Sequence, residues 1–443
     1  MSLRDHARRI LDAAVAAADP RRAVRHALRL EGDALAVGGV ERVALEDIDR
    51  VWVIGAGKAA VGMALGAREV LGERIAGGTI VTRDGYGGRV PGIDVWEAAH
   101  PVPDTRGLAA AADALACARA AGPRDLVLCL LSGGGSALWP APAAGVSLSE
   151  LRTLTDALLR AGATIREMNA VRKHLSRIGG GWLARAAYPA RVVTLVVSDV
   201  VGSPLDVIAG GPTVPDPSTF EDALGVLTAY EIAAPAAVLR HLQAGAAGER
   251  PETPKPGGAE FDTVSAHVVA ANADALRGAA AEAGGLGYRA EILADDLEGE
   301  AREVAREIAR AALERQQAMH SGAAPLALLL GGETTVTVRG RGAGGRNQEL
   351  ALALARELEG CPGIVAASLG TDGTDGPTDA AGGLVDGGTV ARGAAAGLDA
   401  RDHLARNDSH PFLRATGDLL VTGPTGTNVC DVVLVLVEAG VSN

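Results

Sequence analysis

Apolar residues along the chain form short blocks that predict strands and helices in turn. Continuous apolar runs at 51–54 (VWVI), 125–131 (DLVLCLL) and 192–198 (VVTLVVS) are typical of strands covered on both faces. A further strand is expected at 78–82, and helical spacing appears at 58–72, 105–121, 148–161 and 164–187. Strands that alternate with helices in this way predict a parallel α/β sheet with right-handed crossovers.

Two interruptions divide this pattern. Asp19-Pro20 splits the opening helical segment, because proline ends a helix before itself. The stretch 244–260 holds three prolines and no apolar period, so it reads as a linker or an exposed loop. We therefore expect two α/β domains, at 1–250 and 258–443. The second is predicted to hold strands at 267–271, 289–293, 326–330, 364–369, 418–422 and 432–437, a β-rich piece at 334–338, and helices at 273–284, 298–316 and 347–359.

Composition narrows the class of protein. The net charge of −12 argues against a nucleic-acid binder, which would show a basic face. No apolar run approaches the ~20 residues of a membrane span, and the first residues lack a signal-peptide core. The cysteines lie far apart, as expected for reduced core residues: Cys117, Cys129, Cys361 and Cys430. We expect a cytoplasmic protein.

Four glycine-rich polar loops follow predicted strands, at the edge where open α/β sheets bind ligands. In the first, GAGKAA, residues Gly55, Gly57 and Ala60 fit a relaxed dinucleotide fingerprint, but Lys58 stands inside it. The stretch stays open between a dinucleotide site and a phosphate-handling loop.

The second loop, LLSGGGSALWP at 130–140, predicts a phosphate site. Successive backbone N–H groups at a helix start bind anions, and a plain turn would need one glycine and not three. The residues concerned are Ser132, Gly133, Gly134, Gly135 and Ser136. A nucleophile elbow is poorly supported, since Leu138 stands where G-x-S-x-G requires its last glycine.

The third loop, RGRGAGGRNQELALALA at 339–355, imitates a P-loop. Gly340 and Gly345 have the G-x-x-x-x-G spacing, but Arg346 and Asn347 replace the lysine and the Ser/Thr. An arginine can clamp a carboxylate or a phosphate through two parallel hydrogen bonds. A solvated arginine gains nothing from a helix start, so we predict a ligand role for Arg346.

The fourth loop, SLGTDGTDGPTDAAGGLVDG at 368–388, carries Asp372, Asp375, Asp379 and Asp386. Loops of this composition are often only solvated turns. At the end of a strand, however, the carboxylates suit Mg²⁺, which takes one or two of them together with substrate phosphates. The spacing excludes an EF-hand calcium loop.

Other polar segments hold weaker candidates for site residues. These are His100, Asp104, Asn169, Arg172, Lys173, Ser176, Ser198, Asp199, Asp206, Asn407, Ser409, Thr425, Thr427 and Asn428. The nine histidines show no paired ligand spacing, so zinc is not expected. Lysine, arginine, aspartate and oriented N–H groups, without an activated nucleophile, suit phosphoryl transfer, which needs positioning and charge neutralisation. The residues alone predict a Mg²⁺-dependent enzyme that uses ATP.

Eight segments, taken in order, resemble the glycerate 2-kinases that end in a MOFRL domain. They are GAGKAA, HPVPD, LLSGGGSAL, NAVRKHLSRIGGG, SDVVGSPLDVIAGGPT, GGETTVTVRGRGAGGRNQELALA, GTDGTDGPTDAAG and GPTGTNVCD, and they run from about residue 5 to 437. The resemblance implies transfer of phosphate from ATP to D-glycerate, giving 2-phosphoglycerate, with Mg²⁺. It also implies a Rossmann-like N-terminal domain, a mixed α/β C-terminal domain with the MOFRL region at about 325–437, and an active site in the cleft between the domains.

The resemblance places the family's important lysine and arginine at Lys58 and Arg346. We expect Lys58 to bind the glycerate carboxylate or the transferring phosphoryl group, and Arg346 to neutralise the charge that develops. Asp199 is expected to orient Mg²⁺ or the attacking hydroxyl group. The full expected sets are Lys58, His100, Arg172, Arg346 and Asn347 for substrate; Ser132, Gly133, Gly134, Gly135, Ser136, Asn169 and Lys173 for nucleotide; and Asp199, Asp372, Asp375 and Asp379 for Mg²⁺.

The chain departs from the family pattern at Cys430, where a second asparagine is expected, and at 203–205, where a more acidic stretch is expected. Two other functions remain open. One is an NAD(P)H-dependent hydroxypyruvate reductase, for which Asp84 lies near the position of a ribose-binding acid. The other is a non-catalytic sensor of sugar acids or nucleotides. We expect small-molecule substrates, no nucleic acid or membrane partner, and a monomer or homodimer.

Overall fold

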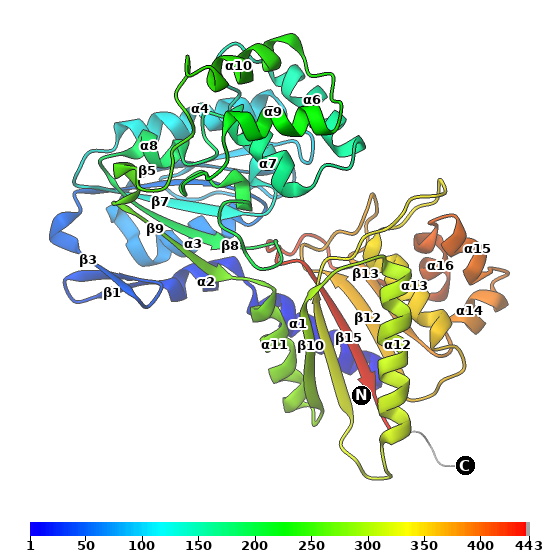
Figure 1. The fold of residues 1–443 in the computed structure, drawn as a ribbon. Coiled ribbons are helices and arrows are strands. Elements are labelled where there is room, and N and C mark those ends of the chain that lie inside the picture. The colour runs from blue at the N-terminus through cyan, green and yellow to red at the C-terminus, as the bar shows by residue number, and fades with distance from the viewer. Residues whose placement is uncertain (440–443) are drawn as a thin grey trace. The chain divides into compact units, whose positions relative to one another are not determined.

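The computed structural model describes residues 1–439, and the chain divides into two compact units (Figure 1). The central unit is residues 20–269, and the terminal unit joins residues 1–19 to the chain from Ala270 onward. This division differs from the predicted ranges 1–250 and 258–443 at both ends. Helix α1 (Leu3–Ala17) packs against α11 (Asn272–Gly285), which brings the first residues into the terminal unit. The stretch 244–260 is not the boundary, because the central unit continues through β9 (Val264–Ala270).

The main sheet of the central unit has the strand order β6-β5-β4-β7-β8-β9. Neighbours from β6 to β8 pair in parallel, as the apolar runs predicted. Counted along the chain this is the 3-2-1-4-5-6 order of doubly wound dinucleotide-binding folds, and the order reverses between β4 and β7. The strands are β4 (Arg50–Ala56), β5 (Ile75–Arg83), β6 (Asp94–Ala98), β7 (Asp125–Ser132), β8 (Arg191–Val197) and β9.

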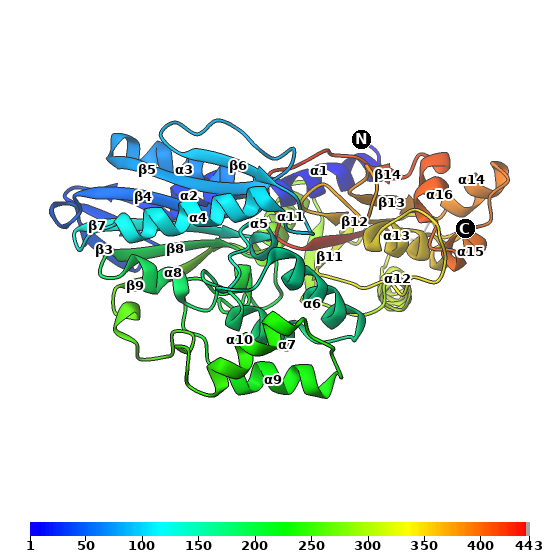
Figure 2. The same cartoon turned by 90° about the horizontal axis from the view of Figure 1, so that it is seen from above.

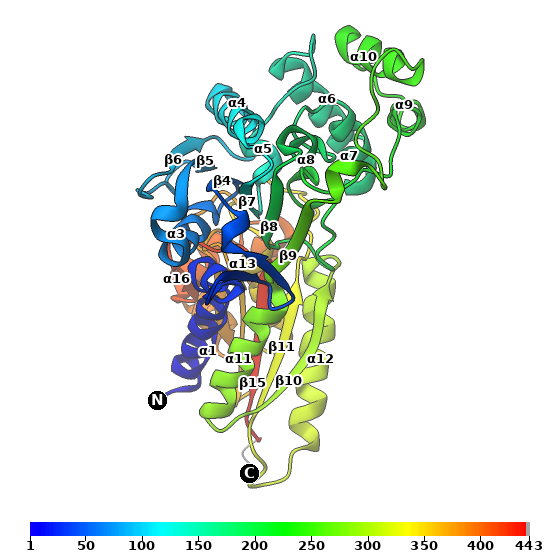
Figure 3. The ribbon, with the colours of Figure 1, turned by 90° about the vertical axis from the view of Figure 1, so that its left-hand side faces the viewer.

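Helices cover both faces of this sheet. Figure 3 shows α3 (Ala60–Leu71) and α4 (Thr105–Ala120) on opposite faces. The predicted helix 164–187 is two helices, α7 (Ile165–His174) and α8 (Trp182–Ala187), because Gly180 and Gly181 between them adopt φ values of 62° and 84°. Two shorter helices are α2 (Pro20–Ala27) and α5 (Gly135–Leu138).

Four helices of the central unit form a small core of their own, seen grouped in Figures 1 and 2. They are α6 (Leu148–Arg160), α7, α9 (Phe220–Ala229) and α10 (Ala236–Ala246). Leu158, Val171 and Phe220 pack together in that core. An antiparallel sheet that the sequence analysis missed completes the unit, with strands β1 (Leu28–Glu31), β2 (Ala34–Val37) and β3 (Glu41–Ala44).

The terminal unit contains a mixed sheet, as expected, in the order β10-β11-β15-β12-β13-β14. Strands β10 and β11 are parallel, and the remaining neighbours are antiparallel. The strands are β10 (Arg289–Leu297), β11 (Leu326–Gly332), β12 (Ile364–Gly370), β13 (Gly382–Asp386), β14 (Leu419–Leu420) and β15 (Asp431–Val437). The helices besides α1 and α11 are α12 (Ala301–Ala318), α13 (Arg346–Glu357), α14 (Thr389–Ala395), α15 (Ala400–Ala405) and α16 (Ser409–Thr416).

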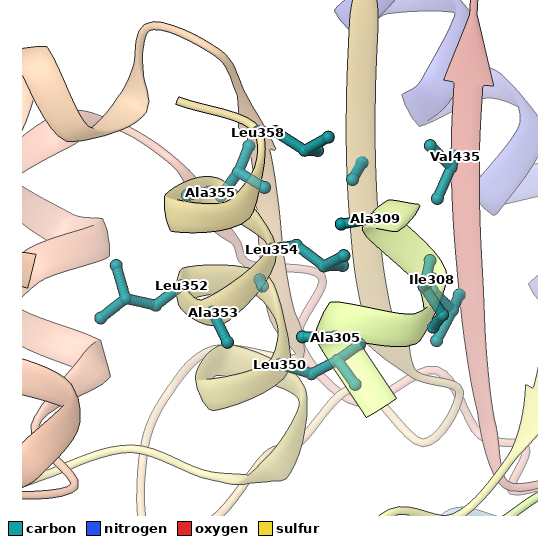
Figure 4. Packing of buried hydrophobic residues seen from close by; sticks show 14 of the residues in the cluster. Ala305, Ile308, Ala309, Leu350, Leu352, Ala353, Leu354, Ala355, Leu358 and Val435 are labelled. Atoms are coloured by element: carbon teal, nitrogen blue, oxygen red, sulfur yellow. The ribbon is translucent and has the colours of Figure 1, made fainter. Parts of the chain in front are cut away.

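Helices α12 and α13 pack closely because small and large side chains face each other. Figure 4 shows Leu350 and Leu354 of α13 directed toward Ala305 and Ala309 of α12, and all four are buried. The spacing of apolar residues in both helices therefore identifies the side chains that are buried in the core. Among the residues that the structure describes, no helix is both long and apolar enough to span a membrane.

Two predicted strands of the terminal unit were wrong in extent. The stretch 334–338 forms only an isolated bridge between Thr335 and Glu300. The backbone N–H of Thr337 donates to the carboxylate of Glu300 (3.0 Å), so it is satisfied without a neighbouring strand. The strand expected at 418–422 is the two-residue β14.

Candidate functional site

Lys58 lies in the loop after β4, and the loop after β7 fixes its backbone. The N–H of Lys58 donates to the carbonyl of Gly133 (2.9 Å), and the N–H of Ala59 donates to Oγ of Ser132 (3.0 Å). Gly57 has a φ of 133°, and a Cβ there would overlap Oγ of Ser132. The loops after β4 and β7, which lie where the strand order reverses, are therefore held together by hydrogen bonds and close packing. Lys58 is half-buried where they meet.

The glycine loop after β7 presents backbone donors. Gly134 adopts a left-handed φ of 84°, and α5 begins at the next residue. No hydrogen bond within the described part of the chain occupies the N–H groups of Gly134, Gly135 or Ser136. His100 lies against this loop, since a Cβ on Gly134 would be 2.9 Å from its Nε2. Successive N–H donors beside an imidazole suit an anionic group.

Five predicted candidate residues line one pocket of the central unit: Ser136, Asn169, Arg172, Lys173 and Ser176. Its volume is about 460 Å³, including solvent at its mouth. Nδ2 of Asn169 is buried and has no hydrogen-bond partner in the described structure. The guanidinium of Arg172 also has no ion-pair partner among the described residues, and burial lowers its pKa. Two unsatisfied donors at one pocket favour a ligand with acceptor oxygens, such as a carboxylate or a phosphate.

Lys173 is engaged differently. Its buried ammonium lies 3.4 Å from the carboxylate of Asp216, which is fully buried, and 3.5 Å from that of Asp206. These contacts hold α7 to the segment that follows β8. Asp199 opens that segment at the carboxyl end of the sheet and is partly exposed. The contacts of Lys173 weigh toward a positioning role for it.

In the terminal unit, Arg346 is the first residue of α13 and is paired with carboxylates of the chain. Its Nε and Nη2 donate to the two oxygens of Asp431 at 2.5 and 3.0 Å, and its Nη1 lies 2.6 Å from Glu333. Burial acts to lower the pKa of Arg346, but the hydrogen bond and charge of Asp431, with Glu333 and Asp375, raise it overall. The two parallel bonds predicted for a ligand are made to Asp431. Sequence reasoning missed this residue, although it ends the quoted motif GPTGTNVCD.

The start of α13 is capped by the chain itself. The carboxylate of Asp375 accepts hydrogen bonds from the backbone N–H groups of Asn347 (3.1 Å) and Gln348 (2.9 Å). Burial raises the pKa of Asp375, against the effect of these hydrogen bonds. Oδ1 of Asn347 accepts from the hydroxyl of Ser368 (2.5 Å). Asn347 and Asp375 thus belong to a buried network at the helix start that had been expected to hold a phosphate.

The P-loop-like spacing before α13 has a structural cause. Oδ1 of Asn407 accepts from the N–H groups of Arg339 (2.7 Å) and Gly340 (3.0 Å), and Oδ1 of Asp408 accepts from that of Ala343 (2.9 Å). A Cβ on Gly340 would overlap the backbone of the facing segment. The glycines allow the loop before α13 to pack against the segment that holds Asn407 and Asp408. The backbone N–H groups of Arg339, Gly340 and Ala343 already donate to these two side chains.

The carboxylates expected for Mg²⁺ do not form one group. Asp379 is exposed and lies 3.2 Å from Arg414, while Oδ1 of Asp372 accepts from the N–H and hydroxyl of Thr374 at 2.9 and 3.0 Å. Nowhere in residues 1–439 do three His, Cys, Asp or Glu side chains gather so as to hold a metal ion. Because Mg²⁺ needs as few as one or two carboxylates with substrate phosphates, Asp199 and Asp372 remain compatible with it. Asp375 and Asp379 are committed to other partners.

The acid that a dinucleotide site would use is also engaged. Asp84 follows β5, and its two carboxylate oxygens accept hydrogen bonds from Nη1 and Nη2 of Arg106, at 2.6 and 2.8 Å. The hydrogen bond from Arg106 lowers the pKa of Asp84. Recognition of a ribose by Asp84 would have to break this pair, which weighs against the dinucleotide interpretation.

Comparison with known proteins covers almost the whole chain. One family model, described as a domain of unknown function (DUF4147), matches residues 6–243, and the MOFRL family model matches residues 326–431. The D-glycerate 2-kinase of Thermotoga maritima is 46% identical over 392 residues, covering 88% of this chain and 91% of that protein. A protein of Agrobacterium vitis, named as a proposed hydroxypyruvate reductase, is 44% identical and covers 99% of this chain and 95% of its own length. The crystal structure of a glycerate kinase from Thermotoga maritima matches with a TM-score of 0.86 at 43% identity, covering 99% of this chain and 100% of that one.

Proposed function

Because the chain belongs to the glycerate kinase family whose C-terminal part is the MOFRL region, we propose that it phosphorylates D-glycerate to 2-phosphoglycerate with ATP and Mg²⁺. Membership of this family makes the chain an enzyme, a phosphotransferase that acts on glycerate. The phosphate donor, the metal ion and the position of the transferred group are the parts that we add.

The observation that carries the proposal is the position of Lys58 beside the Ser132–Ser136 loop, where the strand order reverses. Ligands of doubly wound sheets bind at this point. We assign the phosphates of the nucleotide to the N–H groups of that loop. We assign Lys58 to the transferring phosphoryl group or to the glycerate carboxylate, both of which are anionic.

In the transfer, the oxygen of the C2 hydroxyl group of glycerate attacks the γ-phosphorus and its proton passes to water, while the bond from that phosphorus to the β-phosphate oxygen breaks and ADP leaves. Negative charge spreads over the oxygens of the transferred group, so cations placed there lower the barrier. Mg²⁺, when bound, supplies part of this charge neutralisation, and Asp199 in the central unit or Asp372 in the terminal unit is the carboxylate that we assign to it. Asn169 and Arg172, as unsatisfied donors of one pocket, would bind a carboxylate or phosphate oxygen.

Arg346 remains a proposed charge-neutralising residue. Its contacts with Asp431 and Glu333 use three of the five N–H donors of the guanidinium, so two remain to donate to a ligand oxygen. Because the two carboxylates offset the charge of Arg346, its neutralising effect increases if a ligand oxygen replaces one of them.

One assay tests the activity. The protein is incubated with D-glycerate, Mg²⁺ and ATP, ADP is followed, and the product is identified by ³¹P NMR as 2- or 3-phosphoglycerate. In parallel, hydroxypyruvate is offered with NADH. ADP formation with 2-phosphoglycerate and no loss of NADH supports the proposal. Loss of NADH without ADP would mean a reductase, and binding without either reaction would mean a sensor.

The role of Lys58 is tested by Lys58→Ala. We expect the turnover number to fall by about 100-fold or more, as for the loss of one charge-stabilising group from an active site. Arg89→Ala is the matched control, because Arg89 is an exposed cation of the same unit. Circular dichroism and thermal unfolding establish that both variants are folded. Turnover near that of the unmodified enzyme in folded Lys58→Ala would exclude the assignment.

A further inference from the structure

The central unit holds a second, larger pocket, between α4, α7, α8, α10 and the segment 250–253. Its volume is about 990 Å³, including solvent at its mouth. Neither Lys58 nor the loop 132–136 lines it, and Ser176 is the residue that it shares with the pocket of Asn169 and Arg172. Four arginines do line it: Arg119, Arg177, Arg185 and Arg250. In a chain of net charge −12, this concentrates positive charge at one place on an acidic protein.

The chain neutralises one of these arginines by an ion pair. Arg185 lies 2.7 Å from the carboxylate of Glu260, and its guanidinium lies over the ring of Trp182 at 5.0 Å. Nε of Arg177 donates to the carbonyl of Pro142 (3.0 Å), which carries no charge. Positive charge at Arg177 is therefore not balanced by the group that it contacts.

Arg119 and Arg250 are exposed, and among residues 1–439 neither has a hydrogen-bond or ion-pair partner for its guanidinium. The nearby carboxylate of Glu252 accepts from Nε2 of His174 (2.9 Å) and lies 3.6 Å from the ammonium of Lys255. Three of the four arginines thus face the pocket without a neutralising carboxylate. Their planar forks match the oxygens of a phosphate group.

A buried histidine of this pocket, His241, indicates that the ligand also carries a hydrogen-bond donor. His241 is 8% exposed, and its Nε2 lies 3.0 Å from the carbonyl oxygen of His174. A carbonyl only accepts, so Nε2 carries the proton. Burial, with the charge of Arg250, lowers the pKa of His241, so the ring is neutral and Nδ1 is an acceptor. Nδ1 is buried and has no partner in the described structure.

We propose that this pocket is a second binding site, for a small organic phosphate that also carries a hydroxyl group. The arginines would bind the phosphate, and the hydroxyl would donate to Nδ1 of His241, since a buried acceptor in a native protein nearly always has a donor. Phosphoglycerates and glycerol phosphates have this combination of groups. The site is separate from the loops around Lys58, and its occupation does not depend on the reaction proposed above.

Calorimetric titration with glycerol 3-phosphate tests the site, with methyl phosphate as the matched probe that lacks a hydroxyl. We expect the unmodified protein to bind glycerol 3-phosphate about fivefold more tightly than methyl phosphate, because only the former satisfies Nδ1. In Arg119→Ala/Arg250→Ala, we expect the affinity for glycerol 3-phosphate to fall by about tenfold or more. Arg166→Ala/Arg240→Ala is the control: it removes the same charge from exposed positions outside the pocket, one of them adjacent to His241.

Each remaining outcome overturns the proposal or part of it. Absence of binding, or equal affinity in the Arg119/Arg250 and control variants, excludes the site. Binding that is lost in Lys58→Ala but kept in Arg119→Ala/Arg250→Ala places the probe near Lys58 instead. Equal affinity for the two probes excludes the role of His241. If the two probes do differ, His241→Phe should abolish the difference, with thermal unfolding as the check that this variant is folded.

Discussion

At the scale of single residues, Gly57 shows how a missing side chain shapes the candidate site. Its φ of 133° and the approach of Ser132 leave no room for a Cβ. Its place in the GAGKAA loop fits either a dinucleotide site or a phosphate-handling loop. The structure gives a third reason, because the glycine allows the loop after β7 to pack against the loop that carries Lys58.

Gly57→Ala is therefore expected to displace Lys58 and to abolish most of the glycerate kinase activity. The overlap with Ser132 should lower the free energy of unfolding by about 1–3 kcal/mol more than in the control. That control is Gly299→Ala: Gly299 has a φ of 118°, close to that of Gly57, and the nearest atom to its Cβ position is Cγ2 of the Val304 side chain, at 3.3 Å. Urea unfolding and the ADP assay measure both effects. Equal losses in the two variants would mean that strain alone, and not packing on Ser132, accounts for the glycine.

At the scale of elements, the start of α13 illustrates why a motif does not reveal its partner. A glycine-rich loop before a helix predicts an anion at the helix N-terminus, and an anion is found there. It is the carboxylate of Asp375, supplied by the chain from the segment after β12. In the same way, the side chains of Asn407 and Asp408 accept hydrogen bonds from backbone N–H groups of the glycine-rich loop before α13.

Asp375→Ala is expected to lower the free energy of unfolding by about 1–2 kcal/mol, because it removes the cap of α13. Asp379→Ala is the matched control from the same loop. Its carboxylate is exposed and lies 3.2 Å from Arg414 and 3.3 Å from Nε2 of His410, so solvent screens both contacts and its loss should change stability by about 0.5 kcal/mol or less. Urea unfolding without nucleotide or metal measures both. An unchanged stability in Asp375→Ala, together with a raised Mg²⁺ requirement for activity, would instead indicate a metal ligand.

At the scale of the whole molecule, the N-terminal helix belongs to the terminal unit. Figure 3 shows α1 beside α11, and Arg4 on α1 lies 2.6 Å from Asp386 and 2.7 Å from Asp418. Asp418 is almost fully buried, so its charge depends on these arginine contacts, which Arg392 shares. The predicted first domain, 1–250, therefore wrongly included residues 1–19, because a division of the chain into consecutive segments cannot join its first helix to the later unit.

Arg4→Ala is expected to lower the free energy of unfolding at neutral pH by about 1 kcal/mol, since Arg392 still pairs with both carboxylates. Burial acts to raise the pKa of Asp386, but hydrogen bonds from Arg392 and Arg4 outweigh it and lower the pKa below its usual value. A carboxylate with a lowered folded-state pKa contributes its full stability above the unfolded-state pKa and loses it as the pH falls through the folded-state pKa.

The difference between the unmodified protein and Arg4→Ala should therefore be constant near neutral pH and shrink below about pH 4. Urea unfolding across this range measures it, with Arg8→Ala, an exposed arginine of the same helix, as the control that should show little difference at any pH. A difference that stays constant down to low pH would mean that Arg4 acts by packing and not through its carboxylate partners.

Sequence by itself determined the α/β class, most of the strands and helices, and the family, because apolar periodicity and ordered motifs are local properties of the chain. It also singled out Lys58, whose neighbouring glycines mark a loop after a buried strand. Only the tertiary structure decided which groups meet: Arg346 with Asp431, Asp375 with the start of α13, and Arg119 with Arg250 around one pocket. Partners of this kind come from distant parts of the chain, so the charge that a side chain faces depends on the fold and leaves no mark in its own segment.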